Sequence, residues 1–193
     1  ASAAGCGGPE TVTHTVTVNS ASVTKQLYLS DPSQSLDRVD PVNTADATTA
    51  NTGLLSSTGT TFTTFTMAPV LCSDLVIKAG TISVTNYITI SSGTMPANPA
   101  ITAVLRYGAT NMITLTNPIY NSGLLTWTAT LGADITIPSG QAITLQVTTA
   151  QAGVIFRIDF DSQTKPSKIT LPVSTYIDVT SLEVYSAAYP GGL

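Results

Sequence analysis

The chain has 193 residues, a net charge of −4 at neutral pH and only 7 lysines and arginines, which argues against nucleic-acid binding because that function needs a basic patch. Charged residues make up 9% of the sequence, against about 25% in an average soluble protein. The 34 threonines and 19 serines supply the polarity instead, so we expect a neutral surface that is rich in hydroxyl groups.

The first predicted element is a half-buried strand at residues 11–18, where threonine alternates strictly with other side chains. The alternation resumes at Val23 and continues to Leu29, so we expect residues 1–35 to form an extended N-terminal strand arm. Such a strand can pair within its own chain, or it can add to an open sheet edge of a neighbouring subunit. The residues opposite the threonines are the candidates for strand exchange: Val12, His14, Val16 and Val18.

Residues 36–61 show no hydrophobic period and are predicted to form an irregular connection rich in aspartate and threonine. Four aspartates lie between Asp31 and Asp46, and carboxylate and carbonyl oxygens are the ligands that calcium prefers. A structural calcium ion is therefore an alternative for this segment, although it lacks a DxDxDG calcium loop. No other metal and no cofactor is expected.

Residues 62–193 carry short alternating apolar segments separated by glycine, proline and asparagine turn signals, with no helical stretch between them. This pattern predicts an all-β protein whose body is an antiparallel β-sandwich of the jelly-roll type. An immunoglobulin-like module is the alternative. Trp127 shares a face with apolar neighbours and is expected in the core.

Two aspartates on a late strand raise the question of a charged site. Phe156, Ile158 and Phe160 are expected to face inward, which places Asp159 and Asp161 outward beside Arg157. The simplest interpretation is a solvated group of charges paired with Arg157 and with Lys165 or Lys168. Calcium binding is the alternative.

The sequence offers little for catalysis. His14 is the only histidine and shares its face with three valines, and no GxSxG nucleophile motif is present. We therefore expect a protein that is not an enzyme. For glycan binding, which uses exposed aromatic rings, the candidate ligand-facing residues are Tyr87 and Tyr120.

The first residues, ASAAG, are small and are not preceded by methionine, as in a protein whose signal peptide has been removed. We therefore expect an extracellular or cell-surface location, and no apolar run approaches the ~18 residues that a membrane span needs. Cys6 and Cys72 show no CxxC spacing and are predicted to form a disulfide. Two reduced thiols in a cytosolic protein are the alternative.

Three stretches carry a resemblance to a known group of proteins: FRIDFDS at residues 156–162, KPSKITLP at 165–172 and TYI at 175–177. They resemble β-sandwich modules of large secreted surface and adhesin proteins of gliding and biofilm-forming bacteria. The resemblance covers about residues 62–180 and implies a role in adhesion or in an extracellular matrix. It implies no role for any individual residue.

The functional hypothesis is a secreted structural subunit of an extracellular bacterial fibre, sheath or surface layer. Such a subunit would associate with copies of itself through β-strand contacts and form a homopolymer. The alternative is a monomeric cell-surface adhesin or carbohydrate-binding module, whose partner would be a glycan.

Overall fold

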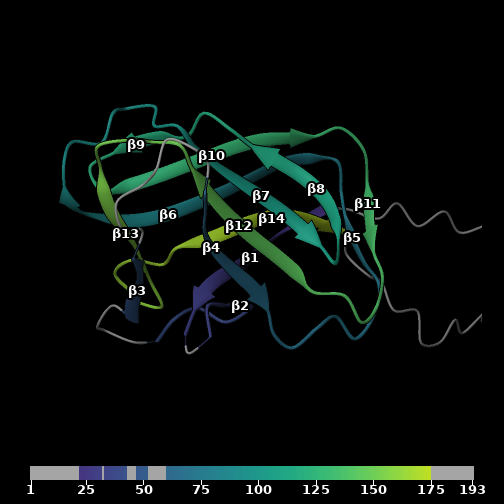
Figure 1. Cartoon of the computed structure of the whole chain (residues 1–193). Helices are drawn as coiled ribbons and strands as arrows, with labels where there is room; N and C mark the ends of the chain where they lie inside the picture. Colours follow the sequence, from purple (N-terminus) through teal and green to yellow (C-terminus); the bar gives the residue numbers. More distant parts are fainter. Residues whose placement is uncertain (1–21, 32, 43–46, 52–59, 175–193) are drawn as a thin grey trace, which may run out of the picture.

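The structure is a computed structural model that describes residues 22–31, 33–42, 47–51 and 60–174, and this part of the chain contains strands and no helix (Figure 1). The all-β prediction is confirmed. The strands are β1 (Ser22–Ser30), β2 (Ser35–Asp37), β3 (Ala47–Asn51), β4 (Thr60–Met67), β5 (Leu75–Ile77), β6 (Gly80–Ser92), β7 (Ile101–Tyr107), β8 (Thr110–Leu115), β9 (Ile119–Asn121), β10 (Leu124–Leu131), β11 (Ile135–Ile137), β12 (Ile143–Thr149), β13 (Ile155–Phe160) and β14 (Lys168–Ser174).

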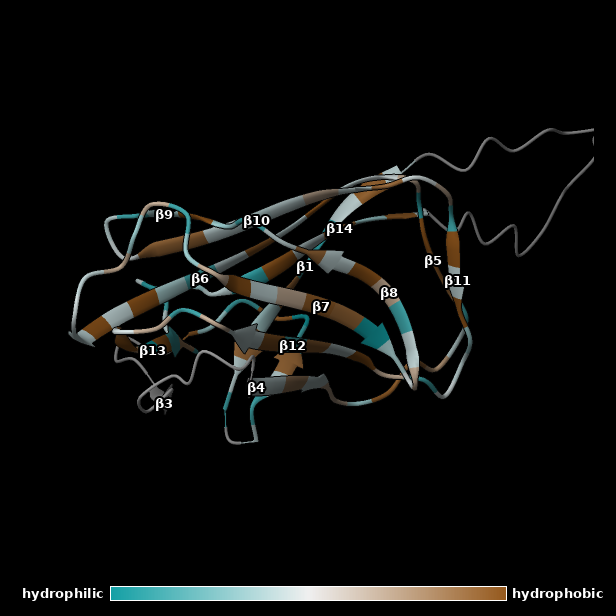
Figure 2. Ribbon diagram, turned by 45° about the horizontal axis from the view of Figure 1, so that its top comes forward, coloured by the Kyte–Doolittle hydropathy of each residue, from teal (hydrophilic) through white to brown (hydrophobic). Residues whose placement is uncertain are grey.

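All the strands belong to one curled sheet with the main order β3-β13-β6-β14-β1-β2-β4-β12-β7-β8. The half that contains β6, β10 and β14 faces the half that contains β4, β12, β7 and β8 (Figure 2). The antiparallel prediction is correct for most pairs, but β2 runs parallel to β4. The short β2 turns back tightly from β1, and its direction there matches that of β4, so the sheet is mixed.

The core lies between the two halves of the curled sheet, and each half contributes alternate side chains. Hydrophobic and polar bands alternate along β6 and β7 (Figure 2). The rings of Phe65 and Phe160 meet edge to face, with centroids 5.2 Å apart. Trp127 is fully buried, as predicted, and its Nε1 donates a hydrogen bond to the carbonyl oxygen of Ile101 at 3.1 Å.

Strands from the predicted arm and the predicted connection belong to the same sheet as the body. β1 pairs antiparallel with β14, from Ser22 opposite Ser174 to Tyr28 opposite Lys168. β3, within the segment 36–61, pairs with β13. The backbone groups of β1 and β3 therefore form ladder hydrogen bonds with strands of the body.

One polar side chain lies in the apolar core without a hydrogen-bond partner. Asn86 is on β6 between the buried residues Val84 and Ile88, and it is fully buried. Neither its Oδ1 nor its Nδ2 has a partner within the described residues. A buried amide in this condition costs about 1–3 kcal/mol relative to a hydrogen-bonded one.

We predict that Asn86→Val raises the free energy of unfolding by about 1 kcal/mol, because valine suits a strand and needs no hydrogen-bond partner. Chemical denaturation measures the change. Ser83→Val on the opposite face of β6 is the matched control, and its effect should stay within about 0.5 kcal/mol. A loss of stability in Asn86→Val would show that the amide is satisfied in solution.

Candidate functional site

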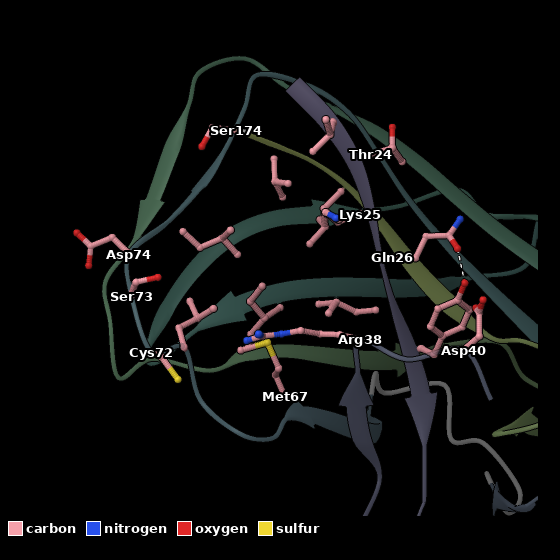
Figure 3. Close-up of a pocket in the computed structure, with 18 residues that line it drawn as sticks. Thr24, Lys25, Gln26, Arg38, Asp40, Met67, Cys72, Ser73, Asp74 and Ser174 are labelled. Carbon is pink, nitrogen blue, oxygen red and sulfur yellow. Dashed lines mark hydrogen bonds between the residues drawn. The ribbon is translucent and has the colours of Figure 1, made fainter. Parts of the chain in front are cut away.

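A groove of about 890 Å³ lies at the end of the curled sheet where its two halves do not close (Figure 3). One bank is the first part of β1. The other bank is the segment from Leu71 to Leu75, which includes Cys72. The groove has the volume of a ligand or peptide site.

The groove exists because β1 has a strand on only one side over most of its length. β14 pairs with β1 from Ser22 to Tyr28, whereas β2 pairs with it only from Tyr28 to Ser30. Within the described residues, no strand covers the second edge of residues 22–27. This edge therefore presents backbone groups that another strand can use.

The floor of the groove is apolar and comes from both halves of the sheet. Leu27, Leu171 and Val173 belong to the β1–β14 side. Met67 and Ile143 come from the opposite half. The floor residues Leu27, Met67, Ile143, Leu171 and Val173 are buried, so the groove is an opening into the core itself.

Two cations project into this opening. Lys25 alternates with Val23 and Leu27 and so occupies a core-side position, yet it is exposed because the opposite half of the sheet does not cover it. Arg38 follows β2 and is also exposed in the groove lining (Figure 3). Neither forms an ion pair with another residue in the described part of the chain.

The carboxylates at the groove already have other partners. Asp74 Oδ1 accepts a hydrogen bond from the backbone nitrogen of Ser139 at 2.8 Å. Asp40 lies beside Tyr28 (Figure 3). The groove therefore combines an apolar floor, an open strand edge, two cations without an ion-pair partner in the described part of the chain, and two carboxylates.

Tyr28 forms the boundary between the groove and the outer face of β1. Its hydroxyl donates a hydrogen bond to Gln26 Oε1, and Lys168 Nζ lies 5.7 Å from the centre of its ring. Burial, followed by the hydrogen bond and negative charge of Asp40, raises the pKa of Tyr28 to about 12. Tyr28 therefore stays neutral across the physiological range.

Asp159 is buried, and the prediction of a solvated aspartate at this position is wrong. Its carboxylate is fully covered, with Lys165 Nζ at 2.8 Å and Thr89 Oγ1 at 2.6 Å from Oδ2. Arg157 Nε lies 3.2 Å from Oδ1 as an ion pair, although the atoms are not aligned for a hydrogen bond. The predicted pairing with Arg157 and Lys165 is confirmed.

Asp159 is covered because the segment after β13 folds back over it. Ser167 Oγ donates to the carbonyl oxygen of Asp159 at 2.7 Å and accepts from the backbone nitrogen of Tyr87 at 2.8 Å. Asp161 begins the turn with a φ of 56°. Strand alternation gave the correct face but could not show that the chain returns across that face.

The other predicted site residues are dispersed. Tyr87 is half-buried on the outer face of β6, and Tyr120 is half-buried against the core. Cys72 is exposed at the groove. Cys6, Val12, His14, Val16 and Val18 lie outside the described residues, so the disulfide and the strand exchange stay predictions.

The described residues contain no group of three or more histidine, cysteine, aspartate or glutamate side chains placed to hold a metal ion. The same part of the chain has no helix with the length and apolar character of a membrane span.

The sequence analysis missed the groove, although one signal for it was present. Lys25 interrupts the apolar face of β1 between Val23 and Leu27. A lysine at a core-side position indicates either a buried ion pair or a place where the core is open.

No known family model and no curated protein matches the sequence. The fold is similar to that of a CocE/NonD family hydrolase from Staphylococcus aureus, for which two solved structures match. One comparison gives a TM-score of 0.54 at 8% identity over 80% of this chain. A second structure gives 0.55 at 10% identity over 79% of this chain. In each case the match spans 37% of the hydrolase chain.

This likeness corrects one prediction. The sequence was interpreted as that of a protein that is not an enzyme, but the solved chains with this fold are hydrolases. The absence of catalytic motifs from a β-module therefore does not exclude an enzymatic role. At this identity the likeness concerns the fold alone.

We predict that the phenol of Tyr28 titrates with a pKa raised to about 12 and that stability falls as the pH rises from 10.0 to about 12. In that window the unfolded chain loses the phenolic proton while the folded chain keeps it, so alkali favours unfolding. Ultraviolet titration of the wild type and of Tyr28→Phe checks this. A late phenolate signal that survives in Tyr28→Phe would belong to another residue.

We predict that Lys165→Met lowers the free energy of unfolding by about 1–3 kcal/mol, because it removes one cation from a buried carboxylate. The expected loss is moderate because Arg157 and Thr89 still contact Asp159. Lys168→Met is the control, since the interaction described for Lys168 is with the ring of Tyr28. Equal losses in the two variants, measured by chemical denaturation, would contradict a specific role for the Lys165 contact.

Proposed function

We propose that the chain is a structural module of an extracellular bacterial fibre, sheath or surface layer, and that it joins neighbouring copies through β-strand contacts at the groove. In this proposal the curled sheet acts as a jelly-roll-like sandwich that is left open at one end. The observation that supports it is the uncovered edge of β1, residues 22–27, beside an apolar floor. An added strand would gain ladder hydrogen bonds and bury apolar side chains at once.

Exposed apolar residues near the groove support a protein partner at this end. The large apolar side chains that are well exposed in the described part of the chain are Val39, Val42, Val70 and Ile119. Val39 adjoins Arg38, and Val70 adjoins Leu71, both of which line the groove. Exposed apolar side chains beside an apolar groove are compatible with a contact to another protein.

The outer face of the sheet suits an extracellular structural role. Thr128, Ser83, Thr170 and Gln26 are cross-strand neighbours in a row over β10, β6, β14 and β1. These four side chains are uncharged, so contacts along this row depend little on salt or pH. The match to 37% of a longer hydrolase chain also supports the use of this fold as one module of a larger protein.

We predict that Val23→Arg weakens self-association at least tenfold, because it places a bulky charge at the mouth of the groove. Sedimentation velocity over a concentration series measures it. Thr128→Arg is the control, since Thr128 is exposed on β10 and lies outside the groove lining. The proposal fails if the wild-type chain stays monomeric at all concentrations, or if Val23→Arg and Thr128→Arg behave alike.

A further inference from the structure

We infer that the outer face of β4, β12, β7 and β8 binds an acidic polysaccharide, and that the guanidinium group of Arg106 binds a carboxylate of its sugar units. These strands are neighbours in the sheet (Figure 2), and their outer face is the side that points away from the core. Arg106 is not part of the groove lining. The inference therefore goes beyond the assembly role proposed above and does not depend on it.

Arg106 lies in a row of polar side chains that crosses the four strands. It is opposite Thr144 of β12 and Asn111 of β8, and Thr144 is opposite Thr66 of β4. Arg106 follows the buried Leu105 on β7, so it faces outward, and side chains directly opposite one another in a sheet share a face. The row therefore places one cation between two hydroxyl groups on one side and an amide on the other.

The guanidinium group of Arg106 has no counter-charge. The side chain forms no hydrogen bond or ion pair in the described part of the chain, and its Nε is buried. This edge of the group has lost water without gaining an acceptor, which costs free energy. The buried atoms without a partner do not include the terminal nitrogens, so these nitrogens face solvent. An anion bound there would offset the cost, at a cation that already lies against the sheet.

The strands around Arg106 supply no carboxylate that could compete for it. β4, β12, β7 and β8 contain no acidic residue, and Arg106 is their only charged side chain. The groove differs in this respect, because its lining contains two carboxylates as well as two cations. The local charge of the outer face therefore favours an anionic ligand.

The chemistry of the row indicates which anion it fits. A guanidinium group binds a carboxylate through two parallel hydrogen bonds, because both groups are planar. Threonine hydroxyls and the asparagine amide each donate and accept hydrogen bonds, so they can bond to hydroxyl groups beside that carboxylate. A carboxylate flanked by hydroxyl groups is the chemistry of uronic acid sugars.

A second row extends this surface and favours a sugar polymer. Gln146 of β12 is opposite Thr64 of β4 and Val104 of β7, and Val104 is opposite Thr114 of β8. The four strands span about 14 Å at ~4.8 Å per strand, which is longer than one sugar unit. Val104 is the one apolar side chain in the two rows, so the surface offers hydrogen bonds and little apolar area. Protein interfaces have apolar centres, and this surface lacks one.

Binding to immobilised alginate, a polymer of uronic acids, tests the inference in the full-length chain by biolayer interferometry. Arg106→Gln should weaken binding about tenfold, because it removes a charge-assisted contact. Lys78→Gln is the charge-matched control and should bind as the wild type does, because Lys78 pairs with Asp134 outside both the rows and the groove lining. Wild-type binding should fall as the salt concentration rises from about 50 mM to about 500 mM. Circular dichroism confirms that each variant is folded.

An added charge gives a second test, which does not depend on the removal of a side chain. Thr66→Arg places another cation at an exposed position in the row of Arg106 and should strengthen alginate binding about threefold. Thr128→Arg adds the same charge at an exposed position on β10 and should have little effect. Equal gains in the two variants would overturn the inference, because net charge alone would then control binding.

Three other results would overturn the inference. The first is wild-type binding to alginate that is no stronger than binding to dextran, which is a neutral polysaccharide. The second is Arg106→Gln binding like the wild type. The third is loss of self-association in Arg106→Gln without alginate, which would assign the face to a carboxylate of a second copy.

Val23→Arg separates this site from the assembly role, because Val23 lines the groove. At concentrations at which both chains are monomeric, Val23→Arg should bind alginate no more weakly than the wild type does. Weaker binding would place the polysaccharide in the groove and overturn the assignment to the outer face. Failure of the wild-type chain to self-associate would contradict the assembly role and leave the predicted effect of Arg106→Gln unchanged.

Discussion

The ladder between β1 and β14 is the interaction on which the open end of this molecule depends. It holds the first described strand to the centre of the sheet, with Ser22 opposite Ser174. It also uses one edge of β1, and the three-residue β2 covers only the end of the other. Because backbone groups at an open edge lack ladder partners, the same pairing that completes the core leaves a place for another strand.

The charged residues divide into two groups according to how the chain covers them. Around Asp159, the turn after β13 brings in Lys165 and Ser167, so a buried carboxylate has close partners and helps to fix the turn. At the groove, Lys25 and Arg38 have no comparable cover. In a chain with only 7 basic residues, the groove holds two cations that have no ion-pair partner among the described residues, beside an apolar floor and the carboxylates of Asp40 and Asp74.

The similarity to hydrolase chains concerns the fold, whereas the proposed structural role concerns the groove. The likeness identifies an all-β curled fold that makes up 37% of a longer chain. Function depends on residues placed on such a fold, and the feature with the most specific geometry here is the groove beside β1. The proposal of contacts at the end of the module therefore rests on the groove rather than on the likeness.

The sequence by itself determined the all-β class, the position of Trp127 in the core and the pairing of Asp159 with its neighbouring cations, because these follow from alternation and local spacing. It could not show that Asp159 is buried, that β2 runs parallel to β4, or that Lys25 stands at an opening in the core. Those features depend on which distant segments meet. Alternation tells which face of a strand is apolar, but only the tertiary structure decides which of its two edges has a partner, because the backbone of every residue type except proline can both donate and accept ladder hydrogen bonds.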